Sequence, residues 1–403
     1  MARQGYRIFD ADTHIIEPAE PIEEHLAAAD RAKLAALGPV IGRAPAKAGM
    51  TRYRIGKVPK LNRRLGSRER VDPPSAVAKG KLDGGTPWDV RWQGPPFPDD
   101  RVSVDPHARV KDLDIEGVDV NMILPSGSLP GFCAIDDVAL EQAMYQAYHR
   151  FLSGYCGAYP GRLFSLVLVS ARDATASVAE MRRCGKDGWP VGIFPICPPA
   201  LSLDDPAWEP IWAEAQEQDL TVVIHSFTMT VPYPPGVWDT WDNVFIQRAA
   251  GHVWNAQRNI AAIIGGGVLD RHPQLRLTAL ECGHGWLPFW ASRLDELAEM
   301  ARRALPPLKQ KPSEYIRGPQ YFQSIQLHEG ELSLKQAIEA LGEDTLMFAT
   351  DYPHSESWFP KSVDNVLGWT SIGESARRKL LWENAGRCYR RAGARVPAEA
   401  RVT

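Results

Sequence analysis

The sequence predicts a closed (β/α)8 barrel of the TIM-barrel type with one long insertion after the first strand. Eight short apolar runs have the character of strands, and nearly all are separated by segments with helical spacing of apolar residues. Some runs, such as 163–169, are almost continuously apolar, as expected for strands covered on both faces. Repeated βα units indicate a parallel sheet, and eight of them indicate a closed barrel, with a doubly wound open sheet as the alternative.

The first strand and the segment after it define the expected domain organisation. We expect residues 1–17 to contain the first barrel strand, residues 18–107 to form an insertion, and residues 108–403 to complete the barrel and its C-terminal helix. The insertion begins with a predicted helix at Ile22–Ala36 and then becomes rich in Pro, Gly and Arg, which disfavours long helices and central strands. We interpret it as a lid or as an arm that contacts a neighbouring subunit.

From residue 108 onward, predicted strands and helices alternate. No GxGxxG pattern follows an early strand, which argues against a dinucleotide-binding fold. After the first strand at Tyr6–Ala11, the predicted strands are 118–124, 163–169, 191–196, 220–225, 275–281, 321–327 and 345–351. The predicted helices are 108–115, 136–157, 174–184, 206–218, 247–269, 287–305, 334–341 and 375–389.

Composition argues against several classes of protein. The 403 residues include 46 basic and 49 acidic residues, so no global positive field favours nucleic acid. Six cysteines without CxxC spacing indicate reduced, mostly buried thiols of a cytoplasmic protein. The first residues lack an apolar export signal, and no run approaches the roughly 18 apolar residues of a membrane span. We therefore expect a small-molecule substrate, with neither nucleic acid nor membrane as a partner.

Acidic residues and histidines stand where the predicted strands end. In a barrel these carboxyl ends form one rim, which is where barrel enzymes place their active sites. Each residue could instead cap a turn, but carboxylates and imidazoles that converge on one rim suit a divalent metal ion. The candidates are Asp12 and His14 on the first strand, His225 after the fifth, Glu281 and His284 after the sixth, and Asp351 and His354 after the eighth.

Several of these motifs resemble the amidohydrolase-related group of the amidohydrolase superfamily, the branch that holds aminocarboxymuconate-semialdehyde decarboxylase and γ-resorcylate decarboxylase. The resemblance implies a (β/α)8 barrel with one divalent metal ion held by Asp12, His14, His225 and Asp351, and an even-numbered homo-oligomer. It is carried by Asp10–Pro18, His225, Glu281–Pro288, Phe348–Glu356 and Glu383–Arg387.

Two departures from the family pattern concern the metal and the proton donor. The first strand carries Asp12-x-His14 where relatives most often have His-x-His, and an oxygen donor makes Mn²⁺ or Fe²⁺ plausible beside Zn²⁺, our first expectation. The sixth strand ends in Glu281 where relatives place a catalytic His, with His284 three residues later. Either residue could be the general acid or base, and Glu281 could instead be a further ligand that permits a second ion.

The expected activity is metal-dependent hydrolysis, in which metal-activated water attacks an amide, ester or lactone carbon of a small organic substrate and His284 protonates the leaving group. The alternative is a non-oxidative decarboxylase of an aromatic or unsaturated carboxylic acid, which would use the same ligands. A second alternative is a catalytically inactive barrel that acts as a binding or subunit-partner protein. A substrate carboxylate would favour a basic partner, for which the insertion offers Arg52, Arg54, Arg63 and Arg64.

Overall fold

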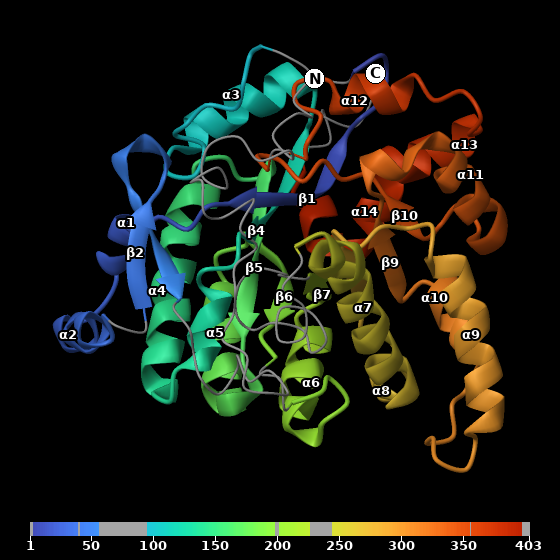
Figure 1. The fold of residues 1–403 in the computed structure, drawn as a ribbon, viewed down its shortest axis with the longest axis horizontal. Coiled ribbons are helices and arrows are strands. Elements are labelled where there is room, and N and C mark those ends of the chain that lie inside the picture. Colours follow the sequence, from blue (N-terminus) through green and yellow to red (C-terminus); the bar gives the residue numbers. More distant parts are fainter. Residues whose placement is uncertain are drawn as a thin grey trace.

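The computed structural model describes residues 3–38, 41–55, 95–197, 201–225, 244–354 and 356–396. Within these residues, eight parallel strands follow one another around a nearly closed barrel, which confirms the predicted (β/α)8 fold (Figure 1). The strands, in spatial order, are β1 (Phe9–Ile15), β4 (Val120–Pro125), β5 (Leu163–Val169), β6 (Pro190–Pro195), β7 (Thr221–His225), β8 (Leu277–Leu280), β9 (Tyr321–Ser324) and β10 (Leu346–Met347).

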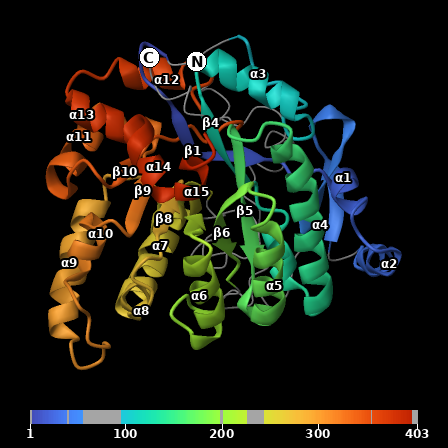
Figure 2. The same ribbon diagram turned by 180° about the vertical axis from the view of Figure 1, so that it is seen from behind.

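Helices connect successive strands and surround the barrel in both views (Figures 1 and 2). Several begin where the sequence provides a cap: Asp105 accepts a hydrogen bond from the backbone N of His107, and Asp137 accepts one from that of Leu140. The connecting helices are α3 (Pro106–Glu116), α4 (Val138–Gly157), α5 (Ala174–Cys184), α6 (Glu209–Glu217), α7 (Val244–Gly265), α8 (Val268–Arg271), α9 (Leu287–Met300), α10 (Pro312–Arg317) and α11 (Gly330–Leu341). Those after the last strand are α12 (Ser362–Leu367), α13 (Glu374–Arg378), α14 (Asn384–Cys388) and α15 (Arg390–Gly393).

Three predicted helices are interrupted. The helix predicted at 247–269 divides into α7 and α8, because Gly267 between them adopts the left-handed conformation. The segment predicted as one helix at Ile22–Ala36 forms α1 (Ala19–Glu23) and α2 (Ala28–Ala36), because the backbone is extended at Ala27, between them. This break lets Ile22 and Leu26 both turn into the core. At the C-terminal end, a π-helical turn at Lys379–Glu383 separates α13 from α14.

The described part of the insertion forms a unit beside the barrel. The antiparallel hairpin of β2 (Ile41–Pro45) and β3 (Thr51–Ile55) lies next to α1, and α1 and α2 contact α4 (Figures 1 and 2). Arg52 is exposed on β3, whereas Arg63 and Arg64 lie outside the described residues, as does the rest of 56–94. The proposed role of this segment as a lid or arm stays a prediction.

The barrel closes between β1 and the residues that follow β10. The backbone N of Ala11 donates to Phe348 O at 3.0 Å, that of Asp351 to Asp12 O at 3.0 Å, and that of His14 to Tyr352 O at 2.6 Å. This seam places the end of the first strand beside the end of the last.

All six cysteines are free. No helix in the described part of the chain is long and apolar enough to cross a membrane.

Candidate metal centre

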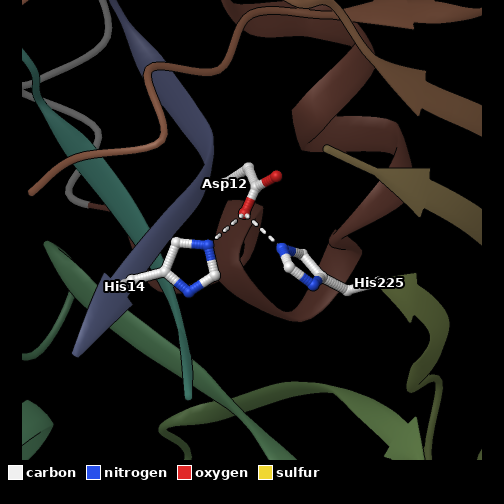
Figure 3. Close-up of side chains that lie close together, drawn as sticks. All are labelled: Asp12, His14 and His225. Carbon is white, nitrogen blue, oxygen red and sulfur yellow. Dashed lines mark ion pairs between the residues drawn. The ribbon is translucent and has the colours of Figure 1, made fainter. Parts of the chain in front are cut away.

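Asp12, His14 and His225 converge at the carboxyl ends of their strands. Asp12 and His14 project from β1 and His225 from β7, and one carboxylate oxygen of Asp12 faces both imidazoles (Figure 3). Asp12 Oδ1 lies 3.6 Å from His14 Nε2 and 4.0 Å from His225 Nε2. All three side chains are buried, so these donor atoms lie inside the protein and not on its surface.

Asp351, the fourth ligand that the resemblance implied, also lies beside His14. It follows β10, and its Oδ1 lies 3.1 Å from His14 Nε2 across the barrel seam. His354 belongs to the same group, because His14, Asp351 and His354 each offer a donor atom within 4.8 Å of the other two. Residues more than 330 positions apart in the sequence therefore contribute to one centre.

Glu281 also lies at this centre. Its Oε2 is 2.8 Å from His225 Nε2 and 3.8 Å from His14 Nε2. Glu281, Asp351 and Glu356 form a further group whose carboxylate oxygens lie within 4.8 Å of one another. The sequence had left Glu281 open as an acid, a base or a ligand, and its position beside His225 is compatible with each of these roles.

His252 is a site residue that the sequence did not reveal. It lies in α7, where its Nδ1 is 2.6 Å from the backbone O of Glu281 and 3.3 Å from its Oε1. The ring thus holds both the backbone and the side chain of Glu281. The other candidates were selected because they stand at the ends of predicted strands. No strand ends at His252, so it was not selected.

His284 has different partners from Glu281. Its side chain is fully buried, and its Nδ1 lies 3.0 Å from Glu329 Oε2 and 3.2 Å from the backbone N of Gln326. Glu329 also accepts hydrogen bonds from the backbone N atoms of His284 and Gly285. His284 itself lies in the turn after β8, and both partners of its Nδ1 lie in the segment after β9.

Burial and neighbouring groups perturb the ionisable residues of the centre. Burial lowers the pKa of His14 well below its usual value, so the ring is neutral, as a metal ligand must be. Burial raises the pKa of Asp12 to about 8, against the opposing effect of His225. Burial also raises the pKa of Glu281, but His252, His225 and His14 together outweigh it and bring that pKa well below its usual value.

The donor set fits a divalent metal ion. Among the described residues, Asp12 Oδ1 and His14 Nε2 are buried atoms without a hydrogen-bond partner, which is costly in a protein interior. His14 Nδ1 lies 3.0 Å from Pro125 O, and a hydrogen bond there leaves the Nε2 lone pair directed toward Asp12 and Asp351. Carboxylates and neutral imidazoles of this kind are the ligands of Zn²⁺, Mn²⁺ and Fe²⁺.

A pocket opens beside these residues. Asp12 and Asp351 form part of its wall, so a molecule inside it would reach the centre directly. The remaining described lining residues come from the ends of β9 and β10 and combine polar with apolar groups: Ile325, Gln326, Leu327, His328, Ala349, Thr350 and Glu356.

Comparison with known proteins now identifies the family. The amidohydrolase family model matches residues 10–391. The chain belongs to the amidohydrolase family. It is therefore an enzyme, and the resemblance drawn from the motifs is confirmed.

Several similar proteins are decarboxylases. The chain is 25% identical over 307 residues to γ-resorcylate decarboxylase of Rhizobium sp. (strain MTP-10005), covering 71% of this chain and 87% of that one. It is 28% identical over 256 residues to 2-amino-3-carboxymuconate-6-semialdehyde decarboxylase of Dictyostelium discoideum, covering 62% and 67%. A solved 5-carboxyvanillate decarboxylase from Novosphingobium aromaticivorans DSM 12444, complexed with manganese, superposes with a TM-score of 0.67, 18% identity and coverage of 96% and 97%.

Proposed function

We propose that this amidohydrolase is a metal-dependent, non-oxidative decarboxylase of a small aromatic or unsaturated carboxylic acid. The observation that favours decarboxylation over hydrolysis is the pair of similar decarboxylases, which match 71% and 62% of the chain. Hydrolysis of an amide, ester or lactone, the reaction that the sequence favoured, would use the same centre. The assay must therefore separate the two reactions.

The proposed metal ligands are Asp12, His14, His225 and Asp351. When bound, a divalent ion would supply a Lewis acid that holds and polarises the substrate carboxylate. Two carboxylate ligands, with Glu281 close by, make the donor set rich in hard oxygen atoms. We therefore propose Mn²⁺ ahead of the Zn²⁺ first expected, and a similar decarboxylase contains manganese.

Glu281 is the proposed residue that delivers the proton. Because its pKa lies well below the usual value, its carboxylate first takes up a proton from water and then passes it to the substrate carbon. Decarboxylation breaks the bond between the carboxylate carbon and the ring or alkene carbon, and the electron pair left on that carbon takes up one proton as CO₂ leaves. Glu281 stands beside His225 and is held by His252, so its carboxyl can be aimed at a substrate at the centre. We assign His284 a positioning role, because its partners are Glu329 and the backbone of Gln326.

The test is a panel of substrates offered to Mn²⁺-loaded and Zn²⁺-loaded protein. The acids are γ-resorcylate and 5-carboxyvanillate, and simple aryl esters, lactones and anilides test hydrolysis. We expect CO₂ release from an acid, with one deuterium in the product when the reaction runs in D₂O. Ester, lactone or amide turnover without CO₂ release would overturn the proposal in favour of hydrolysis.

Two variants assign the proton donor. Glu281→Gln keeps the shape of the side chain but cannot deliver a proton, so we expect CO₂ release to fall by about 100-fold or more. His284→Gln should lower the rate less. The reverse order would assign proton transfer to His284.

The even-numbered homo-oligomer stays a prediction, which sedimentation of the purified protein would test.

A further inference from the structure

The proposed ligands His14 and Asp351 meet across the barrel seam. The strand β10 is only two residues long, and in the described residues it pairs with β9 and not with β1. A few backbone hydrogen bonds therefore link the two sides, among them His14 N to Tyr352 O at 2.6 Å. The 3.1 Å approach of His14 Nε2 to Asp351 Oδ1 depends on what keeps this seam in register.

Arg109 lies directly behind the seam. It projects from α3, and its side chain is fully buried. Its Nη2 donates to the backbone O of His14, and its guanidinium carbon lies 5.3 Å from the centre of the Tyr352 ring. Its other hydrogen bonds anchor it to neighbouring elements: Nη1 donates to Asn121 Oδ1 at 2.7 Å and to Thr13 Oγ1 at 3.2 Å, and Nε to Tyr155 OH at 3.2 Å.

Packing alone does not account for a cation in this position. Taking a guanidinium out of water is costly, and an apolar side chain of similar volume would often fill such a space at least as well. In the part of the chain that the structure describes, no carboxylate lies within ion-pair distance of Arg109, although its charge opposes the rise that burial causes in the pKa of Asp10. Its donors instead go to neutral oxygens, one of which is the backbone carbonyl of a proposed metal ligand. The arrangement favours a role in placing that ligand.

Three contacts fix His14 from three directions. Arg109 holds its carbonyl, Tyr352 accepts from its backbone N, and Pro125 O lies 3.0 Å from its Nδ1. Because the guanidinium also faces the Tyr352 ring, it contacts both sides of the seam at once. Tyr352 is in turn adjacent to Asp351 in the sequence and donates through its hydroxyl to Asp112 Oδ2 at 2.6 Å.

We propose that Arg109 is a positioning residue for the metal centre. It sets the register of His14 against Asp351 and so determines how tightly and in what geometry the ion is held. The inference rests on the metal ligands of the proposed function but not on the reaction catalysed. Loss of outer contacts of this kind typically weakens metal binding by about 10- to 100-fold.

Arg276 offers a matched control at the opposite end of the barrel. It precedes β8, is 4% exposed, and donates to Cys388 O at 2.7 Å and to Asp219 Oδ1 at 2.7 Å. It is thus another buried arginine bound to protein oxygens, but it lies at the amino ends of the strands. Substitution of Arg276 therefore measures how much stability is lost when any buried guanidinium is removed.

The experiment compares Arg109→Met, Arg109→Lys and Arg276→Met with the wild type. Each protein is loaded with Co²⁺ or Mn²⁺ in the absence of substrate. Chelator competition measures its affinity for the metal ion, and the absorption spectrum of the Co²⁺ form reports the geometry of the ligands. Unfolding in urea measures its stability. We expect Arg109→Met to weaken binding at least tenfold and to alter the spectrum. Arg109→Lys should lie between it and the wild type, because lysine lacks the planar fork of donors. Arg276→Met should lose stability but keep the wild-type affinity and spectrum.

Three results would overturn the proposal. The first is that both Arg109 variants bind metal with the affinity and spectrum of the wild type. The second is that Arg276→Met loses as much metal affinity as Arg109→Met. The third is that the wild type takes up no metal, a result that would also remove the proposed metal centre. Should Arg109→Met fail to fold, Arg109→Lys carries the test alone. Because no measurement involves substrate, failure of the decarboxylase assay and failure of this proposal are distinguishable.

Discussion

Replacement of Glu116 by Gln should make the protein more stable at neutral pH. Glu116 ends α3, is 4% exposed, and accepts a hydrogen bond from the backbone N of Val363 at 2.8 Å. Burial, together with the nearby charge of Asp10, raises the pKa of Glu116 from 4.5 to about 8. The native state therefore keeps a proton on this carboxyl at pH values where the unfolded chain has lost it.

The sign and size of the effect follow from proton linkage. As pH rises above 4.5 the unfolded state gains by ionising, so the wild type loses about 1.4 kcal/mol of unfolding free energy per pH unit from this group until pH approaches 8. Between pH 5.5 and 7.5 the loss is about 3 kcal/mol. Gln does not titrate and keeps an oxygen for Val363 N, so Glu116→Gln should avoid this loss.

Urea unfolding followed by tryptophan fluorescence at pH 5.5, 6.5 and 7.5 measures the difference between the two proteins. Groups that do not interact with position 116 titrate equally in both proteins, so the difference isolates Glu116 and its interaction with Asp10. Glu299→Gln, in which an 80% exposed side chain is replaced, is the control and should show no such trend. A difference between wild type and Glu116→Gln that is the same at all three pH values would refute the reasoning.

Three further predictions concern the metal centre, the turn after β8 and the buried acid of α5. Asp351→Asn should abolish metal-dependent turnover and weaken metal binding at least tenfold in chelator competition, and near-normal values would count against its role as a ligand. Gly283→Ala should lower the melting temperature, because Gly283 has φ +75° and an added Cβ would lie 2.1 Å from Glu329 Oε1. Burial raises the pKa of Glu180, but the hydrogen bonds and charges of Arg183 and His149 together outweigh it and lower that pKa to about 2. The wild type should therefore lose stability relative to Glu180→Gln as pH falls from about 4.5 toward 2, measured by acid denaturation.

The fold could be predicted from the sequence because each barrel strand is a short, strongly apolar run of consecutive residues. The strand 163–169 and the helix 174–184 have the predicted bounds, since a buried strand and an amphipathic helix each leave a clear pattern. The last strand was predicted to run from 345 to 351, yet β10 contains only Leu346–Met347. Residues after it join β1 through single hydrogen bonds, which a hydrophobic pattern cannot distinguish from a strand.

The site could be predicted as far as its residues follow strands. That rule selected Asp12, His14, His225 and Asp351 as candidates, because parallel strands bring their carboxyl ends to one rim. His252 could not be found, because it reaches Glu281 from the middle of a helix and depends on how α7 packs. Arg109 was missed for the same reason, since nothing in the sequence distinguishes a buried arginine of a helix from an exposed one.

The backbone gives an independent reason to assign function to two of the carboxylates. Glu281 has φ +48° and Asp351 has φ +63°, a left-handed conformation that costs a residue with a side chain about 1–2 kcal/mol and that glycine would adopt without strain. The surroundings hold both residues in place: the backbone N of Glu281 donates to Ser324 Oγ at 3.2 Å, and that of Asp351 donates to Asp12 O at 3.0 Å. Stability alone would favour glycine or asparagine at such turns. Acidic side chains at both positions, each within 4 Å of His14 Nε2, are therefore better explained by what they bind than by the fold that surrounds them.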